Sequence, residues 1–194
     1  MLLAAGEGSR FGRPKALVEW NGQTLAERGV EMLLVGGADP VLIVTGAAPL
    51  ELATERQVQI VHNAEWRTGM GSSLRAALRA LPSDADAAVV ALADQPLVGP
   101  AAVARLIAAR RAGASVAVAA YEGQPRNPVL LAREHWPEVI ATAVGDQGAR
   151  EFLRARPDLV TLVECADTGR PDDIDTPADL DRVAGRQARP AAPQ

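Results

Sequence analysis

Leu3-Ala4-Ala5-Gly6-Glu7-Gly8-Ser9-Arg10-Phe11-Gly12-Arg13-Pro14-Lys15 follows directly on an apolar N-terminal run. A glycine-rich turn after a strand lets backbone N–H groups approach phosphate oxygens, and Arg10 and Lys15 add positive charge there. Lys15 is the only lysine of the chain, and every other basic position except the two histidines is arginine. A compact ammonium on a flexible stem differs from a planar guanidinium and is a usual phosphate ligand. The segment therefore predicts phosphate binding.

Two well-known glycine-rich loops do not match this spacing. A P-loop needs Gly-Lys followed by Ser or Thr, whereas Gly12 is followed by Arg13-Pro14-Lys15-Ala16. The dinucleotide fingerprint needs Gly-x-Gly-x-x-Gly, whereas Gly6, Gly8 and Gly12 are spaced one residue too far. Both interpretations are weakened.

Apolar, β-branched runs alternate along the chain with segments of helical periodicity. The expected strands are Met1–Ala5, Val41–Thr45, Val58–Val61, Ala87–Ala93, Ser115–Ala120 and Leu159–Val163, and the expected helices are Gln23–Val35, Ser72–Leu81, Ala101–Arg111, Gln147–Ala155 and Ala178–Ala184. Strands buried on both faces have continuous apolar runs, so the pattern predicts a three-layer α/β/α fold with a mostly parallel sheet.

Smaller features complete this prediction. Pro128–Ala132 is expected to add an antiparallel strand near the sheet edge. Residues 1–184 are expected to form a single domain, and residues 185–194, rich in Pro, Ala and Arg, a disordered tail. Met1 leaves only about five residues for the first strand, at the short end of ordinary strands, so a start upstream of Met1 stays open.

Composition limits the classes of partner. The 194 residues are 48% hydrophobic and 23% charged, and the formal net charge of −4 offers no general attraction to nucleic acid or anionic lipid. The longest apolar stretches fall far short of the roughly 20 residues that cross a bilayer. A single cysteine, Cys165, and the lack of a leader pattern favour the cytoplasm.

Two acidic turns are candidate metal-binding positions. Asp94 follows the apolar run Ala87–Ala93, at the expected carboxyl end of a buried strand, where open α/β sheets bind ligands. Mg²⁺ prefers one or two carboxylates together with phosphate oxygens and water. Asp173 and Asp175 lie in a second acidic turn, where Thr176 and Pro177 begin a helix, so at least one of these carboxylates could serve only as an N-cap.

The pattern Leu-Ala-Ala-Gly-x-Gly-x-Arg-x-Gly-x-x-Lys resembles the signature of nucleotidyltransferases that join a nucleoside monophosphate to a phosphorylated acceptor. Over roughly residues 1 to 184, the chain resembles the MobA-like NTP transferases, the molybdenum-cofactor cytidylyl- and guanylyltransferases. The supporting motifs, in the family's order, are Asn63-Ala64-Glu65-Trp66, Gly69-Met70-Gly71-Ser72-Ser73-Leu74, Ala93-Asp94-Gln95-Pro96-Leu97, Gly145-Asp146-Gln147-Gly148-Ala149-Arg150 and Asp173-Ile174-Asp175-Thr176-Pro177-Ala178-Asp179-Leu180. The resemblance implies a Rossmann-like nucleotidyltransferase fold.

The resemblance also implies roles for particular residues. The catalytic residues would be Lys15, Arg10 and Asp94, and Mg²⁺ would be held by Asp94 with Asp173, slightly favoured, or Asp175. The nucleotide-binding residues would be Leu3, Ala4, Ala5, Gly6, Gly8, Arg10, Lys15, Asn63, Gly71, Ser72 and Asp94. The acceptor-binding residues would be Arg126, Asn127, Asp146 and Arg150. Cofactor cytidylyltransferases usually have Gly-His-Pro where this chain has Arg126-Asn127-Pro128, a departure that bears on the pterin acceptor.

The implied reaction is transfer of a nucleoside monophosphate from an NTP to a phosphorylated acceptor, with release of pyrophosphate. The acceptor is expected to be a molybdopterin-type cofactor, and a sugar phosphate or another small phosphorylated alcohol is the alternative. Ala4-Ala5-Gly6 looks more like the cytidylyl branch, which favours CTP over GTP. A molybdoenzyme or its chaperone would be a further partner. Some relatives of this group are pigment (nicotine blue) oxidoreductases, so an NAD(P)H-dependent oxidoreductase on the same fold is the alternative. A nucleotide-sensing module without turnover is a third.

Overall fold

The computed structural model describes residues 1–52 and 58–187. Its strands are β1 (Leu2–Leu3), β2 (Glu19–Trp20), β3 (Gln23–Thr24), β4 (Val41–Thr45), β5 (Val58–His62), β6 (Ala87–Leu92), β7 (Val116–Tyr121), β8 (Gln124–Ala132) and β9 (Val160–Glu164). Its α-helices are α1 (Leu25–Val35), α2 (Met70–Ala80), α3 (Pro100–Arg111), α4 (Trp136–Thr142), α5 (Arg150–Ala155) and α6 (Pro177–Gln187). No helix within the described ranges is long and apolar enough to span a bilayer.

The main sheet confirms the predicted mostly parallel arrangement. Seven strands of the described chain lie in the order β5-β4-β1-β6-β8-β7-β9. β8 is antiparallel to both of its neighbours, whereas the other pairs in the sheet are parallel. The antiparallel strand was expected near the sheet edge, and this was wrong: β8 lies between β6 and β7, and β9 forms that edge. The apolar run of β8 fits an interior place, since Val129 to Ala132 are buried.

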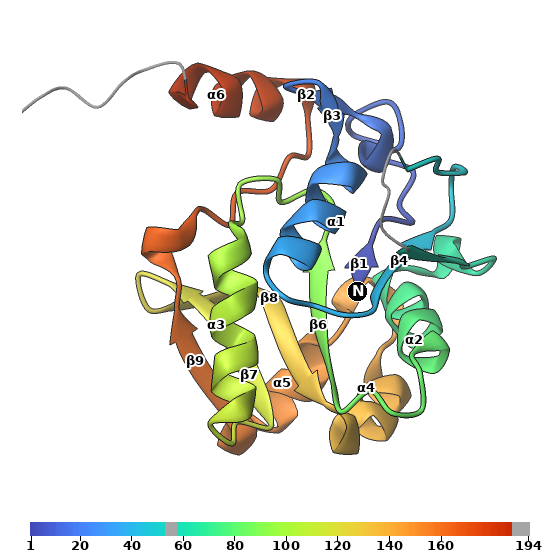
Figure 1. Ribbon diagram of the computed structural model, residues 1–194. Helices are drawn as coiled ribbons and strands as arrows, with labels where there is room; N and C mark the ends of the chain where they lie inside the picture. The colour runs from blue at the N-terminus through green and yellow to red at the C-terminus, as the bar shows by residue number, and fades with distance from the viewer. Residues whose placement is uncertain (53–57, 188–194) are drawn as a thin grey trace, which may run out of the picture.

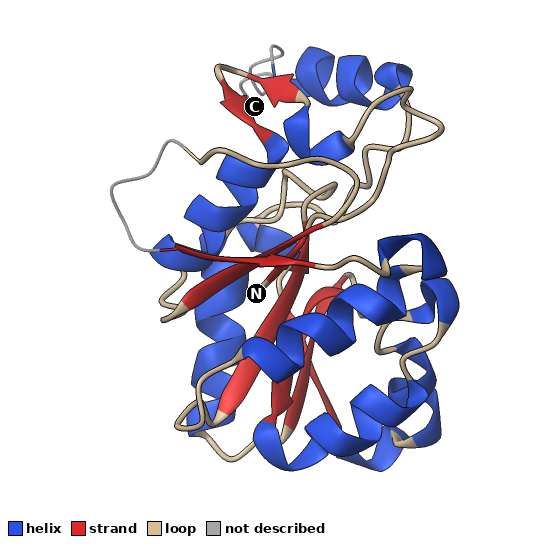
Figure 2. Ribbon diagram, turned by 90° about the vertical axis from the view of Figure 1, so that its right-hand side faces the viewer, coloured by secondary structure: helices blue, strands red, loops and turns tan. Residues whose placement is uncertain are grey.

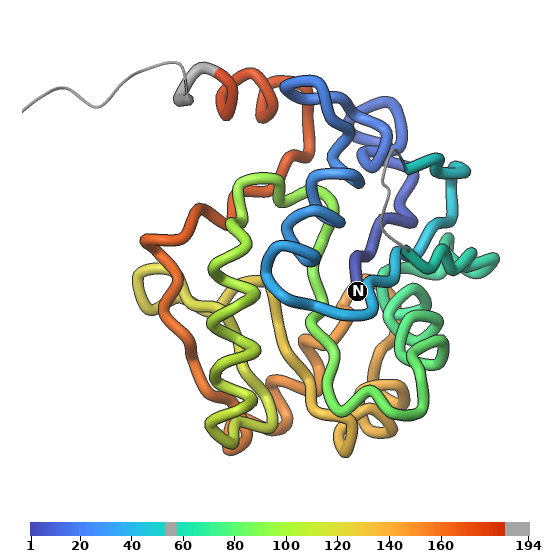
Figure 3. Tube along the Cα trace, in the orientation of Figure 1, coloured from blue at the N-terminus to red at the C-terminus, as the bar shows by residue number. Residues whose placement is uncertain are grey.

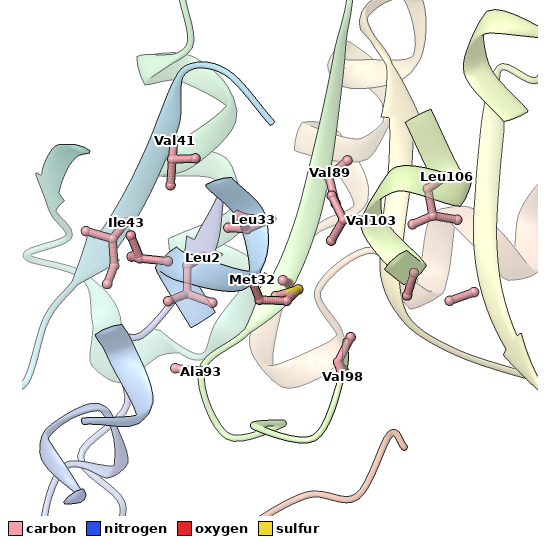
Figure 4. Packing of buried hydrophobic residues seen from close by; sticks show 14 of the residues in the cluster. Leu2, Met32, Leu33, Val41, Ile43, Val89, Ala93, Val98, Val103 and Leu106 are labelled. Carbon is pink, nitrogen blue, oxygen red and sulfur yellow. The ribbon is translucent and has the colours of Figure 1, made fainter. Parts of the chain in front are cut away.

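Helices cover both faces of the sheet (Figures 1 and 2). α1 and α3 pack together on one face, and α2, α4 and α5 on the other. Successive strand residues point to opposite faces, so Leu2 and Ile43 join the cluster under α1 and α3, whereas Leu3 and Val44 join the cluster under α2 and α4. Figure 4 shows the first cluster around Leu2. This double burial explains why the inner strands β1, β4, β6 and β7 have continuous apolar runs, whereas the edge strands β5 and β9 carry exposed residues.

A third, small cluster lies apart from the sheet. Val18, Trp20, Leu25, Ile174 and Val183 are buried together and bring the β2–β3 hairpin against the C-terminal segment and α6. In Figure 3 the blue segment after β1 and the red segment before α6 meet at this end of the molecule. The cluster therefore joins the segment that carries Lys15 to the segment that carries Asp175.

Sequence periodicity missed three local features. Glu19–Trp20 and Gln23–Thr24 pair as a hairpin around Asn21 and Gly22, both at positive φ. α4 was not predicted, because its 7 residues are too few to show a clear helical period in the sequence. α6 continues to Gln187, three residues beyond the predicted boundary at 184, and the rest of the predicted tail, 188–194, lies outside the described residues.

The short strand β1 gives a test of the fold. Leu2 is fully buried, and α1 approaches it closely enough that a Cβ on Gly29 would lie 2.7 Å from its side chain. We expect Leu2→Ala to lower the free energy of unfolding by about 2–5 kcal/mol, because it leaves a cavity in the central strand. Urea denaturation followed by circular dichroism measures this. The matched change Leu162→Ala, at a half-exposed position on edge strand β9, should cost less than about 1 kcal/mol; equal losses would contradict the central role of β1.

Candidate functional site

The glycine-rich segment folds back on itself after β1. Gly8 has φ +64°, and a Cβ there would collide with the carbonyl oxygen of Arg13 and lie 3.1 Å from the backbone nitrogen of Lys15. The carbonyl oxygen of Gly8 accepts hydrogen bonds from the backbone nitrogens of Phe11 and Gly12, both at 2.9 Å. Only glycine both adopts this positive φ readily and lacks the Cβ that would collide with Arg13. The turn returns Lys15 to the end of the sheet.

Lys15 bridges two carboxylates from distant parts of the chain. Its Nζ lies 2.6 Å from Asp94 Oδ2 and 2.7 Å from Asp175 Oδ1. Burial by itself lowers the pKa of the ammonium, but the charges and hydrogen bonds of both carboxylates outweigh it, so the pKa of Lys15 is raised. Arg10 is mostly exposed and reaches Asp175 Oδ2 at 3.2 Å. The site thus brings negative charges from two other segments beside the positive charges of the glycine-rich loop.

The backbone places Asp94 and Asp175 side by side. Asp94 follows β6, as predicted, and its carbonyl oxygen accepts a hydrogen bond from Ile174 N at 2.8 Å. Thr176 caps α6 reciprocally with Asp179, whose Oδ2 accepts from Thr176 N at 2.8 Å. These hydrogen bonds with Thr176 lower the pKa of Asp179 to about 2. Because Thr176 and Asp179 fill the capping roles, the Asp175 carboxylate stays available to Lys15.

Asp173 faces a different partner. Its Oδ1 accepts a hydrogen bond from Nε2 of Gln95, a buried side chain, at 2.8 Å. Burial raises the pKa of Asp173, and the neighbouring charges of Asp94 and Asp175 raise it further. Asp172 forms a two-pronged pair with Arg170, with both distances at 2.8 Å. Of the two carboxylates predicted as alternatives, Asp175 shares Lys15 with Asp94, whereas Asp173 is turned toward Gln95.

Lys15, Arg10, Asp94 and Asp175 line a cavity of about 410 Å³, a size that suits small-molecule ligands, whereas Asp173 is not among the described residues of this lining. The lining contains the predicted residues Leu3, Ala4, Ala5, Gly6, Gly8, Arg10, Lys15, Asp94, Asp146 and Asp175, together with Glu7, Ser9, Ala16, Trp66, Arg67, Gly69, Met70, Ser73, Leu92 and Ala93. In the described ranges, no three acidic, histidine or cysteine side chains form a ready metal cluster. Asp94 and Asp175, held on either side of one ammonium, are nevertheless the hard oxygen donors that Mg²⁺ takes alongside phosphate oxygens.

Three residues predicted to contact the nucleotide are not among the described residues that line the cavity. Asn63 is buried and donates from Nδ2 to Oγ of Ser72 at 2.8 Å and of Ser73 at 3.0 Å. Ser72 Oγ in turn donates to the carbonyl oxygens of Glu65 and Gly69. Gly71 packs against the backbone of Ala143. The network fixes the start of α2, and Ser73 rather than Ser72 reaches the cavity.

The predicted acceptor residues do not gather at one place. Arg126 and Asn127 lie at the start of β8, where Arg126 is exposed and donates to the carbonyl oxygen of Pro125 at 3.0 Å. Arg150 is exposed at the start of α5. Among the four predicted residues, all within the described chain, only Asp146 lines the cavity. It does so from the α2 side, where its Oδ1 accepts from Met70 N at 3.3 Å.

Sequence reasoning assigned no role to Trp66, Arg67 and Met70 in the cavity wall. The Arg67 guanidinium lies over the Trp66 ring at 4.4 Å, and both residues line the cavity. Trp66 belongs to a segment that the sequence singles out, but a motif match does not tell which face a side chain takes.

Comparison with known proteins shows the family to which the chain belongs. Residues 1–160 match the family described as the MobA-like NTP transferase domain. The chain is 40% identical over 194 residues to "Nicotine blue oxidoreductase" of Paenarthrobacter nicotinovorans, covering 94% of each protein. It is 34% identical over 123 residues to "Probable molybdenum cofactor guanylyltransferase" of Opitutus terrae, covering 63% of this chain and 60% of that one.

Among solved structures, the fold is similar to a homologue of Mycobacterium tuberculosis Rv0371c from Mycobacterium sp. strain JC1. The TM-score is 0.79 at 30% identity, covering 95% of this chain and 93% of the other. The family match, the glycine-rich loop and the sheet around it agree: this chain belongs to the MobA-like NTP transferase domain family.

Proposed function

We propose that this protein transfers a nucleoside monophosphate, with CMP favoured over GMP, from an NTP to a phosphorylated acceptor of the molybdopterin type, in the cytoplasm. In this reaction an acceptor phosphate oxygen attacks the α-phosphorus, a new P–O bond forms, and the bond to the β-phosphate breaks to release pyrophosphate. The observation that carries the proposal is the Lys15 ammonium held between Asp94 and Asp175 in a cavity lined by a glycine-rich loop.

Positioning and charge dominate the catalysis of phosphoryl transfer, so the protein needs cations more than an acid or a base. Lys15 stays protonated at neutral pH, because its pKa is raised. It can turn from the carboxylates to the triphosphate on its flexible stem. Arg10, three-quarters exposed at the rim, adds a second cation for the pyrophosphate leaving group.

The carboxylates fit a divalent cation, and we assign Mg²⁺ to Asp94 and Asp175. Both carboxylates offer hard oxygen atoms next to the Lys15 ammonium. The remaining ligands of the cation would be phosphate oxygens and water. When bound, Mg²⁺ supplies positive charge to the triphosphate. Asp175 is preferred over Asp173, because Asp173 is engaged by Gln95.

A redox function is the second candidate, since "Nicotine blue oxidoreductase" is 40% identical over almost the whole of both chains. In that case the same cavity would bind NAD(P)H. The spacing of Gly6, Gly8 and Gly12 counts against a redox function, because it does not match the dinucleotide-binding fingerprint. The paired carboxylates also count against it, because hydride transfer has no need of them.

One experiment separates the two candidates. Purified protein is mixed with molybdopterin, Mg²⁺ and each of the four NTPs, and pyrophosphate release is measured, while NADH oxidation is followed in a parallel cuvette. Release with CTP or GTP supports the transferase and names its base. Absence of release together with acceptor-dependent NADH oxidation would overturn the transferase in favour of the redox function.

Lys15→Ala tests the central cation. We expect kcat/KM for nucleotidyl transfer to fall by on the order of 10²–10³, because the variant loses one stabiliser of developing charge. The neighbouring exposed residue Arg13 gives the control, because it is not among the described residues that line the cavity. The Arg13→Ala variant should keep its activity. A near-normal rate for Lys15→Ala would remove Lys15 from the mechanism.

Asn substitutions distinguish the carboxylates. We expect Asp94→Asn and Asp175→Asn each to raise the Mg²⁺ concentration for half-maximal pyrophosphate release by about 10-fold or more, since each removes a hard anionic ligand. Asp173→Asn should shift it less, and Asp172→Asn, which alters only the surface pair with Arg170, should leave it unchanged. A larger shift for Asp173→Asn than for Asp175→Asn would reverse the assignment.

A further inference from the structure

Part of the cavity wall combines apolar side chains with the Trp66 ring, over which the Arg67 guanidinium lies at 4.4 Å. Trp66, Met70 and Leu92 line it together with the start of the glycine-rich loop. A Cβ on Gly46 would lie 2.6 Å from the Trp66 side chain and 2.8 Å from the carbonyl oxygen of Ala5, so the tryptophan packs beside that loop. Aromatic and apolar surfaces of this kind suit a planar heterocycle. If Lys15 and Arg10 hold the phosphates, this wall is left for the ring of the nucleotide.

One carboxylate lies next to Met70 in this wall. Asp146 lines the cavity, and its Oδ1 accepts a hydrogen bond from Met70 N at 3.3 Å. Within the described chain no other hydrogen bond engages this carboxylate, so Oδ2 can accept one from a ligand. A carboxylate accepts hydrogen bonds and cannot donate them, so it discriminates between ring substituents that donate and those that accept.

The loop that carries Asp146 is fixed by backbone contacts. A Cβ on Gly69, where φ is +106°, would collide with the carbonyl group of Gly145, and one on Gly71 would lie 2.6 Å from the carbonyl oxygen of Ala143. The Arg75 guanidinium donates a hydrogen bond to the same Ala143 oxygen. Two glycines therefore let the loop lie directly on the start of α2, which holds Asp146 in one place and makes it suitable for recognition.

We propose that Asp146 is a specificity-determining residue that accepts a hydrogen bond from the exocyclic amino group of the nucleobase. The inference rests on the proposed nucleotidyl transfer and adds its base selection. Cytosine presents an amino group, whereas uracil presents a carbonyl oxygen at the same ring position. That oxygen would face the carboxylate, acceptor against acceptor, and leave it unpaired. Guanine carries an amino group that hypoxanthine lacks, so the same chemistry applies to the GTP alternative.

Asp146→Asn tests this with little change in shape. The amide oxygen keeps the acceptor for Met70 N, whereas the amide nitrogen replaces an acceptor by a donor, which suits uracil. Pyrophosphate release is measured with the pairs CTP and UTP, and GTP and ITP, and kcat/KM is compared within each pair. Binding of the same nucleotides is followed by fluorescence, since Trp66 lines the cavity whereas Trp20 and Trp136 are buried.

We expect the wild-type enzyme to prefer the amino-bearing member of the pair it uses, and Asp146→Asn to reduce that ratio by about 10- to 100-fold. Asp172→Asn, which neutralises a carboxylate paired with Arg170, is the control and should keep the wild-type ratio. Asp146→Ala provides a second variant: it removes the contact with Met70, and it too should lose the preference for the amino group.

The outcomes separate the two levels of the argument. If the wild-type enzyme turns over NTPs and both Asp146 variants keep its ratio of kcat/KM within each nucleotide pair, the role of Asp146 is overturned and the transferase stays intact. Lower stability to unfolding of Asp146→Ala alone would then assign Asp146 to holding the loop. A wild-type enzyme that uses UTP as well as CTP, and ITP as well as GTP, would also overturn it. Absence of pyrophosphate with every NTP would overturn the proposed function itself.

Discussion

A single ammonium group joins three segments that are far apart in the chain. Lys15 comes from the loop after β1, Asp94 from the end of β6, and Asp175 from the segment before α6, and the two ion pairs are 2.6 and 2.7 Å long. Three charges in a partly buried space are tolerated because opposite charges are paired there. The small cluster around Trp20 and Ile174 holds the outer two segments together, so the bridge and the packing support one another.

The same arrangement bears on how an acidic protein would bind the anionic substrate proposed for it. The net charge of −4 gives no general attraction, so the cations must act locally. In the structure, Lys15 is paired with two carboxylates. Under the proposed function a divalent cation would take over these carboxylates, so that metal and phosphate would be accommodated by an exchange of partners, without burying a new unpaired charge.

The cavity combines two kinds of wall, and they are built differently. The charged wall depends on the long, flexible side chains of Lys15 and Arg10, which reach carboxylates carried by other segments of the chain. The wall formed by Trp66, Met70 and Asp146 depends on backbone packing between α2 and the loop before α5, where glycines permit a close approach. Flexible groups suit a triphosphate whose charge changes during the reaction, and a fixed wall suits recognition of a rigid ring.

The sequence by itself determined the class of fold, the order of most elements and the position of the glycine-rich loop, because these follow from local patterns. Continuous apolar runs indicate buried parallel strands, and the glycine-rich segment that ends at Lys15 indicates a turn after the first strand that carries positive charge. Only the tertiary structure decided the interior place of β8, the choice of Asp175 over Asp173 as the partner of Lys15, and the meeting of Asp146 with α2. It also turned Asn63 and Ser72 toward each other and left Arg126, Asn127 and Arg150 apart. Each of these features depends on which segments, far apart in the sequence, pack against each other in the fold. Local residue types and spacings do not determine that packing.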